Sequence, residues 1–271
     1  MDLSDRPALD ADTVRARIVG PDKLWRRFDV VTETGSTNAD LLARARAGQD
    51  IAGAVLAAEH QTAGRGRNGR QWSTPPRSQV AVSVGVDPAG VPSSAWGLLP
   101  LATGVAVVDA VAAVTGIEVK LKWPNDVLAE TGKLAGILAE VASPAPIVVI
   151  GTGINVTLSA DEVPDPVAAS LSMLGASAVD RTALLIEFLA QLAGRVRSWR
   201  DAEGADEELL ADYRRRSATL GTEVKALLPG DQQVVGRAVD VDEFGRLLID
   251  TAGERITVAA GDVTHLRPAR H

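Results

Sequence analysis

The chain has 271 residues, 46% of them apolar and 23% charged, and a formal net charge of −7 at pH 7. This length suffices for one substantial core and a small second module, and the acidic balance argues against a nucleic-acid partner. The sequence contains no cysteine, which excludes a disulfide framework, a thiolate metal site and a cysteine nucleophile.

The distribution of apolar residues and histidines excludes further classes of protein. We find no apolar run of the ~20 residues that a membrane span needs, and the polar start after Met1 does not resemble a signal peptide. The three histidines, His60, His265 and His271, are scattered and do not form a histidine-rich metal site. We therefore expect a cytoplasmic protein with no membrane partner.

Strand and helix signals alternate in the first half of the chain. Residues 1–28 are charged and alanine-rich, and we treat them as a short N-terminal extension. A long apolar helix is expected to start at Ser93 or Ser94, to end at Gly116 and to be buried on most sides. The elements expected here are strands at 29–32, 54–59 and 80–84 and helices at 11–19, 39–47 and 94–114.

The second half begins with strands and continues with two helices. Residues 133–141 and 147–152 form a plausible antiparallel pair around a turn that contains Pro144 and Pro146. The other elements expected here are a strand at 117–122, an amphipathic helix at 181–200 and a helix at 206–216.

The pattern changes at Ala218, where glycine-separated short strands replace the helices. We expect these strands at 223–228, 233–241, 246–250 and 255–258, a spacing that suits a small β-barrel. The predicted domains are therefore residues 1–217, including the N-terminal extension, and residues 218–271.

Residues 64–70 hold three arginines, Arg65, Arg67 and Arg70, spaced by glycines inside an acidic chain. Glycine lets the backbone approach a ligand closely, and the planar arginine side chain suits carboxylate and phosphate oxygens. The segment is either a mobile loop that folds over a small anionic ligand or a solvated hairpin tip.

The other polar motifs each have a structural explanation beside a functional one. Ser36, Thr37 and Asn38 suit an N-cap, and their groups also suit a neutral polar ring. A lysine at a strand edge can simply extend its ammonium group into water, and an Asn-Asp pair after proline can be a turn. A tryptophan can be an ordinary core residue, and a Gly-Thr-Gly sequence is usually a turn. The residues concerned are Lys122, Lys133, Asn125, Asp126, Trp72, Gly151 and Gly153.

Five sequence blocks taken in order resemble the biotin–protein ligases (biotin–acetyl-CoA-carboxylase ligases). The resemblance covers roughly residues 29–268. The blocks are residues 34–38 (Thr-Gly-Ser-Thr-Asn), 59–73 around the arginine loop, 122–127 (Lys-Trp-Pro-Asn-Asp-Val), 132–138 (Gly-Lys-Leu-Ala-Gly-Ile-Leu) and 151–156 (Gly-Thr-Gly-Ile-Asn-Val).

This resemblance implies an α+β fold. It is a mixed β-sheet flanked by helices, like the catalytic domain of class II aminoacyl-tRNA synthetases, with a small C-terminal SH3-like β-barrel. It implies the form without an N-terminal DNA-binding domain, because only about thirty residues precede the blocks and they lack a basic recognition helix.

The resemblance also assigns roles to residues. Lys133 and Arg67 would be catalytic, and Asp126 would hold Mg²⁺. The biotin-binding residues would be Ser36, Thr37, Asn38, Gln61, Gly64, Arg65, Gly66, Arg67, Lys133, Gly136, Gly151 and Gly153. The ATP-binding residues would be Arg67, Arg70, Trp72, Lys122, Asn125, Asp126 and Asn155. The segment 157–169, rich in Asp and Pro, resembles a second mobile loop, and we assign no roles to its residues.

The implied reaction has two steps that need no cysteine or serine nucleophile. The biotin carboxylate attacks the α-phosphate of MgATP to give biotinyl-5′-AMP and pyrophosphate, and a lysine of a biotin carboxyl carrier domain then attacks the adenylate and releases AMP. The alternatives are a lipoate or octanoate ligase or transferase of the same fold and, less consistent with the short N-terminus, a DNA-binding regulator. The sequence leaves the oligomeric state open and slightly favours a monomer.

Overall fold

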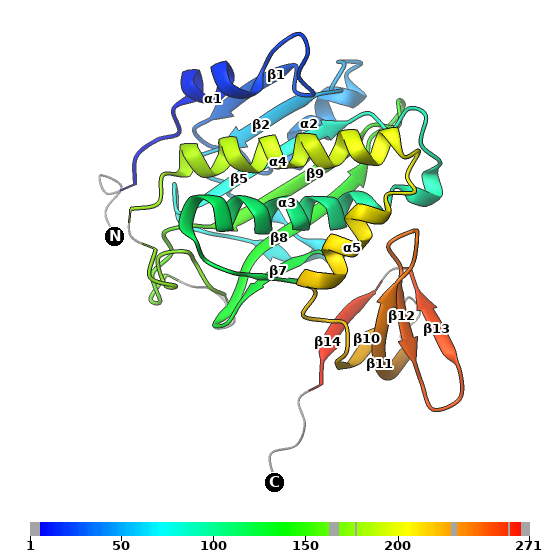
Figure 1. Cartoon of the computed structure of the whole chain (residues 1–271). Coiled ribbons are helices and arrows are strands. Elements are labelled where there is room, and N and C mark those ends of the chain that lie inside the picture. The colour runs from blue at the N-terminus through cyan, green and yellow to red at the C-terminus, as the bar shows by residue number, and fades with distance from the viewer. Residues whose placement is uncertain (1–5, 163–167, 177, 229–231, 260, 267–271) are drawn as a thin grey trace.

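The computed structural model describes residues 6–162, 168–176, 178–228, 232–259 and 261–266. In this part of the chain, a mixed seven-stranded sheet carries helices on both faces, and a five-stranded antiparallel sheet follows at the C-terminal end (Figure 1). The α+β class with a second, all-β part is therefore confirmed.

The larger sheet is antiparallel except at one edge. The strands are β1 (Arg27–Val31), β2 (Ala54–Ala58), β5 (Gln79–Val86), β9 (Val148–Asn155), β8 (Gly132–Val141), β7 (Asp126–Ala129) and β6 (Lys120–Lys122), in that spatial order. Only the β1–β2 pair is parallel, and every other neighbouring pair is antiparallel. The fully buried β5 lies near the centre and reads as an almost continuous apolar run.

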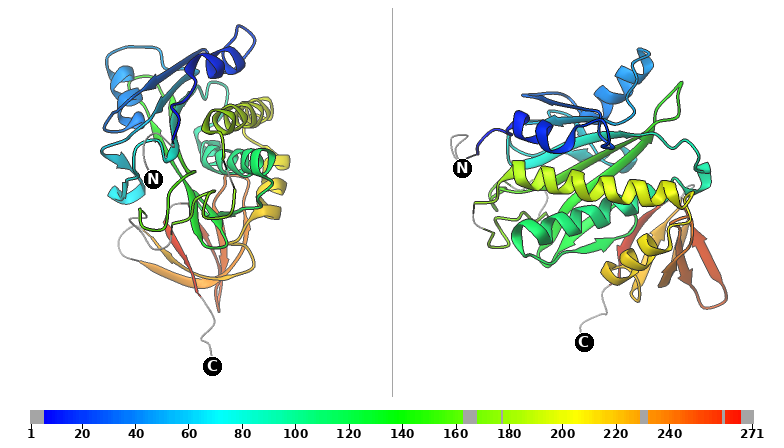
Figure 2. Two further views of the ribbon diagram at one scale, coloured as in Figure 1. Left: turned by 90° about the vertical axis from the view of Figure 1, so that its left-hand side faces the viewer. Right: turned by 45° about the horizontal axis from the view of Figure 1, so that its top comes forward.

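One face of the sheet is covered by α3 (Leu98–Thr115) and α4 (Arg181–Asp201), which pack against each other (Figures 1 and 2). Two shorter helices extend this layer: α1 (Ala11–Ile18), packed against α4, and α5 (Glu207–Arg216), packed against α3. The predicted helices at 11–19, 181–200 and 206–216 agree with these within one residue at each end.

The opposite face is covered only in part. α2 (Thr37–Arg46) packs over β2, β5 and β9, with Leu41 and Leu42 in one cluster with Leu56 and Val149. Figure 2 shows α2 and the arginine-rich segment on the side of the sheet away from α3 and α4. The middle of this face therefore stays free of a covering helix.

The long apolar helix differs from the prediction at its start. Residues Ser93–Ala95 form a 3-10 turn, and α3 begins only at Leu98. The C-terminal part packs closely against the residue before the helix, Gly97. A β-carbon on Gly97 would lie 2.8 Å from the Phe244 carbonyl oxygen. The helix ends as predicted at Gly116, which has a positive φ of 72°.

The same helix also corrects our statement that no apolar run has membrane-spanning length. Residues Ser93–Thr115 are long and apolar enough to cross a membrane by length and composition, with a hydropathy of 1.9. In the fold, 67% of this window is buried, because α3 is enclosed by α4 and the sheet. A buried core helix passes the same test for physical reasons unrelated to a bilayer.

The C-terminal sheet has the strand order β13 (Arg255–Val258), β12 (Leu247–Asp250), β11 (Gln233–Val241), β10 (Glu223–Leu227) and β14 (Asp262–His265). Four of these strands match the predicted ones, and β14 was missed. We also missed β7, whose first residue, Asp126, we read as part of a turn. Both strands are only four residues long, so each carries little of the alternation by which a strand is recognised.

Two buried tryptophan contacts join the C-terminal sheet to the larger one. Trp123, which is 1% exposed, donates from its indole Nε1 to the Gly245 carbonyl oxygen (2.9 Å). Its backbone N–H donates to Thr219 Oγ1 (3.0 Å). The turn between β6 and β7 is thereby fixed to the segment that leads into β10.

Asp212 on α5 organises a cluster of ion pairs between helices. Its carboxylate contacts Arg195 of α4 at 2.5 Å and Arg216 at 3.6 Å, and also contacts Arg215. Asp109 of α3 binds Arg195 (3.1 Å) and Arg216 (2.6 Å) from the other side. Burial alone would raise the pKa of Asp212, but the hydrogen bond from Arg195 and the neighbouring charges hold it below its usual 3.8.

Replacing this carboxylate should destabilise the helical layer. We expect Asp212→Asn to lower the free energy of unfolding by about 2 kcal/mol, between the values for exposed and buried pairs. Because the pKa of Asp212 is lowered in the folded state, its contribution is complete above pH 3.8 and disappears as the pH falls below that value. Denaturant titrations of both proteins at several pH values measure this difference, with Asp22→Asn, an exposed carboxylate, as the matched control. A difference that does not shrink in acid would contradict the assignment.

Candidate functional site

A cavity of about 400 Å³ lies on the uncovered face of the larger sheet. Its floor is formed by β8 and β9, and its walls come from α2, the arginine-rich segment, the β6–β7 turn and β14. Of the site residues predicted from the sequence, all except Gly64 line this one cavity. They are Ser36, Thr37, Asn38, Gln61, Arg65, Gly66, Arg67, Arg70, Trp72, Lys122, Asn125, Asp126, Lys133, Gly136, Gly151, Gly153 and Asn155.

The α2 end of the cavity is lined by a buried network of uncharged polar groups. Gln61 Oε1 accepts hydrogen bonds from the backbone N–H (2.9 Å) and the hydroxyl (3.1 Å) of Thr37. The Thr37 hydroxyl also shares a hydrogen bond of 2.6 Å with the hydroxyl of Ser83 on β5, which donates to Asn38 Oδ1 (2.6 Å). This end therefore offers fixed donors and acceptors without a net charge, which suits a neutral polar ring.

The N-cap explanation of the Ser-Thr-Asn motif is also correct. Ser36 precedes α2 with extended backbone geometry, and its hydroxyl accepts from the Ala39 N–H. Thr37 and Asn38 belong to the first turn of the helix, from which their side chains reach the cavity. Capping and cavity lining thus coexist in one motif.

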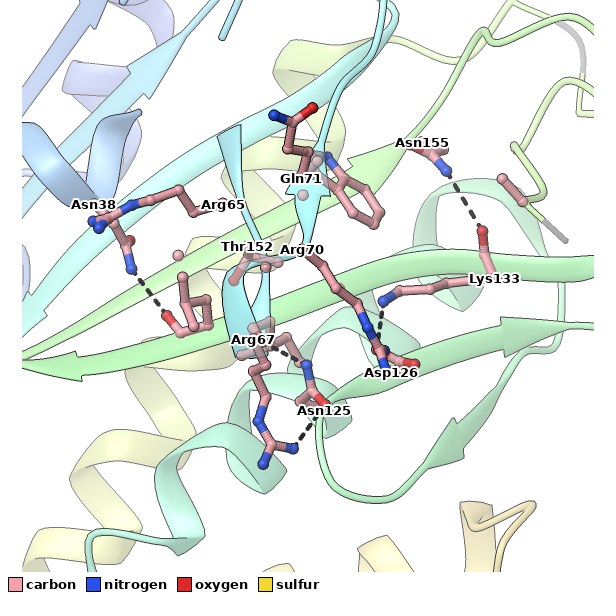
Figure 3. Close-up of a pocket in the computed structure, with 18 of the residues that line it drawn as sticks. Asn38, Arg65, Arg67, Arg70, Gln71, Asn125, Asp126, Lys133, Thr152 and Asn155 are labelled. Carbon is pink, nitrogen blue, oxygen red and sulfur yellow. Dashed lines mark hydrogen bonds and ion pairs between the residues drawn. The ribbon is translucent and has the colours of Figure 1, made fainter. Parts of the chain in front are cut away.

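The arginine-rich segment is a small hairpin. Strands β3 (Gly64–Arg65) and β4 (Gln71–Trp72) pair, and a 3-10 turn over Arg67–Gly69 joins them. The side chains cross the cavity: Arg65 contacts Glu140 of β8 at 3.3 Å, and Arg67 donates to Asn125 Oδ1 at 3.3 Å. The segment is thus a hairpin, as one explanation held, but its arginine side chains face the cavity, as the other requires (Figure 3).

The other end of the cavity is strongly cationic. Lys133 Nζ lies 2.6 Å from Asp126 Oδ1 and 5.3 Å from the centre of the Trp72 ring. Figure 3 shows Arg70 and Lys133 both pointing toward Asp126. Among the described lining residues, the charged side chains are one carboxylate, Asp126, and five cations. Arg67, Arg70, Lys122 and Lys133 belong to this end, whereas Arg65 lies beside Asn38 at the other end and is paired with Glu140 (Figure 3). A ligand with several negative charges would be stabilised here.

Glycines on the cavity floor make room for protein side chains. Gly151, Gly153 and Asn155 alternate along β9 and face the same side, and Gly153 is paired with Gly136 of β8. A β-carbon on Gly153 would lie 2.6 Å from Trp72 Nε1, and one on Gly151 would overlap the Asn38 amide. The resemblance made these glycines biotin-binding residues. In the structure they allow Trp72 and Asn38 to lie against the sheet.

Trp72 is held over this floor at a fixed position. Its indole Nε1 donates to Gln79 Oε1 (2.6 Å), and its ring is only partly buried. Trp72 is therefore not an ordinary core residue, the structural explanation that we had left open. One aromatic face beside the cationic groups is available for stacking.

The donors for a metal are few. In the described residues, no group of three or more histidine, aspartate or glutamate side chains lies close enough to hold an ion. Asp126 is the lining carboxylate, and Asn125 is its neighbour. This set fits Mg²⁺, which keeps several waters and takes one or two carboxylates together with substrate phosphates.

The C-terminal sheet also reaches the cavity. Val263 and Thr264 of β14 line it, and the next residue, His265, shares a 3.0 Å hydrogen bond with Thr219 Oγ1. Burial, and then the charge of Lys122, lower the pKa of His265 below its usual 6.5. The imidazole is therefore neutral at pH 7, and adds no charge to this wall.

Sequence reasoning missed several residues at the site. Ser83 and Gln79 lie on the apolar strand β5, where polar residues in a run of valine and alanine were the available signal. Glu140, which accepts hydrogen bonds from Asn38 Nδ2 (2.9 Å) and Arg65, ends an apolar strand and reads as a solvent-facing residue. Val263 and Thr264 gave no signal, because β14 itself was missed.

The chain is similar to known proteins over nearly its whole length. Residues 31–155 match the Biotin/lipoate A/B protein ligase family, and residues 219–266 match the Biotin protein ligase C terminal domain. The Biotin–[acetyl-CoA-carboxylase] ligase of Mycobacterium tuberculosis is 54% identical over 97% of both chains. The Bifunctional ligase/repressor BirA of Escherichia coli is 31% identical over 80% of this chain and 67% of its own length.

The solved structures agree with these matches. The biotin protein ligase of Aquifex aeolicus in complex with biotin and ATP superposes with a TM-score of 0.77 and 27% identity, covering 90% of this chain and all of that one. The match over residues 31–155 assigns the part of the chain that carries most of the larger sheet to the Biotin/lipoate A/B protein ligase family. Within it, this chain belongs to the biotin protein ligases.

The contact of Glu140 with the hairpin generates a prediction. We expect Glu140→Ala to speed amide exchange in residues 64–72 by about two- to fivefold, because a partly exposed ion pair contributes up to ~1 kcal/mol. Hydrogen-exchange mass spectrometry of the ligand-free protein measures this. Glu130→Ala, at an exposed position in the β7–β8 turn, is the matched control. Equal exchange in wild type and Glu140→Ala would show that the hairpin does not depend on this contact.

Proposed function

We propose that this chain catalyses the ATP-dependent attachment of biotin to a lysine of a biotin carboxyl carrier domain, the reaction for which its M. tuberculosis relative is named a Biotin–[acetyl-CoA-carboxylase] ligase. One observation carries the proposal: a single cavity joins an uncharged polar end to a cationic end. Biotin has a neutral ring system and one carboxylate, and ATP brings a base and a triphosphate, so the two substrates match the two ends.

The uncharged end is assigned to biotin. Donors and acceptors that suit the ureido ring are presented by Thr37, Asn38, Gln61 and the Ser36 turn. The floor of this end carries no side chain at Gly151 and Gly136. The hairpin residues Gly64, Arg65 and Gly66 close this end. With its ring bound in the uncharged network, biotin would direct its carboxylate toward Arg67 and Lys133, where the cavity lining becomes positively charged.

The cationic end is assigned to ATP. The partly exposed Trp72 ring offers a stacking face for adenine, with Gly153 beneath it. Arg70, Lys122 and Asn125 surround the space for the phosphates. Asn155 donates to the Ala169 carbonyl oxygen (2.9 Å), so it both lines the cavity and holds the segment that returns beside Lys133.

Mg²⁺ would be held by Asp126 together with phosphate oxygens and water. When bound, it would neutralise part of the triphosphate charge and favour departure of pyrophosphate. Asp126 now pairs with Lys133 at 2.6 Å, and nucleotide binding would release this lysine from the carboxylate. The lysine can then face the substrates.

In the first step, a carboxylate oxygen of biotin attacks the α-phosphorus, an acyl–phosphate bond forms, and the bond to pyrophosphate breaks. Lys133 and Arg67 reduce the repulsion between the two anions and stabilise the charge that builds up on the α-phosphate. In the second step, the neutral amine of the acceptor lysine attacks the acyl carbon. An amide forms, AMP leaves, and the amine loses a proton to solvent.

Three further assignments accompany this function. We place the boundary between the catalytic and SH3-like domains at residues 217 and 218, and we propose a cytoplasmic location and a monomer. No DNA partner is required for the reaction.

The acyl substrate can be tested directly by ligand stabilisation, because a ligand that binds only the folded state raises Tm. We expect biotin to raise the Tm of this protein by several degrees, and lipoate and octanoate to leave it unchanged at the same concentration. Differential scanning fluorimetry with the three acids, each with and without MgATP, makes the comparison. Stabilisation by lipoate or octanoate but not by biotin would overturn the proposed substrate.

Lys133 should be essential for the first step. We expect Lys133→Ala to slow biotin-dependent pyrophosphate release by a few hundredfold or more, since such a contact is worth ~3–4 kcal/mol in the barrier. Lys120→Ala removes an exposed lysine from β6, two strands away from Lys133 in the sheet, and serves as the control. A folded Lys133→Ala protein with near wild-type pyrophosphate release would exclude this role.

The two floor glycines should affect the two substrates separately. Gly153→Ala displaces Trp72 and is expected to raise KM for ATP by about tenfold, whereas Gly151→Ala displaces Asn38 and is expected to raise KM for biotin to a similar extent. Gly194→Ala adds the same methyl group to α4, where nothing lies within 4 Å, and should change neither constant. Steady-state kinetics with each substrate varied in turn tests this, and an exchange of the two effects would reverse our placement of the ligands.

A further inference from the structure

Residues 6–10 precede α1 and form what we call the N-terminal segment. Its first residue, Arg6, is buried, with a side chain only 3% exposed. Arg6 Nη2 donates to the carbonyl oxygen of Thr157 (2.8 Å) and to Glu162 Oε2 (2.5 Å). A charged group from the start of the chain is therefore buried against the turn that follows β9, more than 150 residues away.

This turn, residues 157–162, is closed around the Glu162 carboxylate. Glu162 Oε2 accepts hydrogen bonds from the backbone N–H (3.1 Å) and the hydroxyl (2.9 Å) of Ser159. Burial alone would raise the pKa of Glu162, but the hydrogen bonds from Arg6 and Ser159 lower it to about 2. The carboxylate is thus ionised at neutral pH, and Arg6 supplies the opposite charge.

The turn forms part of the cavity wall. Leu158 lines the cavity, and its carbonyl oxygen accepts from the Ser170 hydroxyl (2.7 Å). Ser170 belongs to the returning segment, in which Ala168 also lines the cavity and the Ala169 N–H donates to the Lys133 carbonyl oxygen (2.9 Å). A shift of the turn would therefore also displace the part of the cavity wall beside Lys133.

A second set of contacts connects the N-terminal segment to Trp72. The Pro7 carbonyl oxygen accepts from Arg181 Nη2 (2.6 Å), and the Leu9 N–H donates to Glu59 Oε1 (2.6 Å). Arg181 and Glu59 form a buried ion pair of 2.7 Å, with side chains 4% and 8% exposed.

This ion pair is connected by hydrogen bonds to Trp72 at the nucleotide end of the cavity. Arg181 Nη1 donates to the carbonyl oxygen of Gln79 (3.0 Å), and the Gln79 side chain holds the Trp72 indole. The backbone of the N-terminal segment thus satisfies hydrogen bonds of a buried pair that would otherwise be incomplete.

From the contacts of its side chain we propose that Arg6 is a positioning residue for the nucleotide half of the active site: through Thr157 and Glu162 it fixes the wall formed by Leu158 and Ala168. The inference rests on the proposed function, in which this half of the cavity binds ATP. Arg6 touches neither substrate and acts only by ordering a wall that the nucleotide would otherwise have to order on binding, at a cost in affinity.

The test compares four variants in biotin-dependent ATP–pyrophosphate exchange. We expect Arg6→Ala to raise KM for ATP about tenfold while changing kcat and KM for biotin less than about twofold, because a lost charge-assisted hydrogen bond weakens ordering rather than chemistry. Arg6→Lys retains a charged donor and should restore part of the affinity. Glu162→Gln should act in the same direction as Arg6→Ala but less strongly, since the amide still accepts from Ser159. Arg17→Ala, an exposed arginine of α1, is the control.

Hydrogen exchange and Tm measured on the same variants separate positioning from general destabilisation. The proposal predicts faster exchange in residues 157–162 of Arg6→Ala, with α3 unchanged. It is overturned if the turn loosens but KM for ATP does not change, or if kcat falls with Tm and Arg6→Lys gives no rescue. If the wild-type protein supports no biotin-dependent ATP–pyrophosphate exchange, the proposed function itself is contradicted. This outcome is distinct from the two that overturn the role of Arg6.

Discussion

The architecture of the site depends on one steric constraint, the absence of side chains along part of one sheet face. On β9, Gly151, Gly153 and Asn155 alternate on the face that forms the cavity floor, and Gly153 is paired with Gly136 of β8. The indole of Trp72 and the amide of Asn38 occupy the space that β-carbons would fill. Because the opposite face is covered by α3 and α4, the sheet remains stable while this face stays open. The positions of the Trp72 indole and the Asn38 amide on the cavity floor are thus a consequence of where the glycines fall in the strand register.

The charge of the cavity is assembled from separate elements of an acidic protein. The hairpin supplies Arg65, Arg67 and Arg70, while β6 and β8 supply Lys122 and Lys133. Single partners, such as Glu140 for Arg65 and Asp126 for Lys133, hold these side chains in place and leave net positive charge at one end. Such a field favours a polyanionic nucleotide locally, although the whole chain carries −7. The uncharged network around Thr37 and Ser83 makes the other end selective for a neutral group.

How much of the structure the sequence predicts depends on how far apart in the chain the residues lie that determine each feature. Long periodic helices and apolar strands were predicted within a few residues, and all but one of the residues that the motifs singled out line the cavity, because local pattern and family resemblance suffice for them. Short strands such as β7 and β14 were missed because four residues carry little of the alternation by which a strand is recognised. The contacts of Glu140 with Arg65 and of Arg6 with Glu162 could not be predicted, since each joins residues more than 70 positions apart. The reason for the floor glycines likewise appeared only when Trp72 and Asn38 were seen against them.

The central claim is that one cavity carries both activation of biotin and its transfer to a carrier lysine. The most direct measurement is intact-mass spectrometry of a biotin carboxyl carrier domain after incubation with this protein, biotin and MgATP. The account predicts a mass increase of one biotinyl group per carrier, which requires ATP and disappears when the acceptor lysine is replaced. An unmodified carrier, in the presence of folded protein that binds both biotin and ATP, would contradict it.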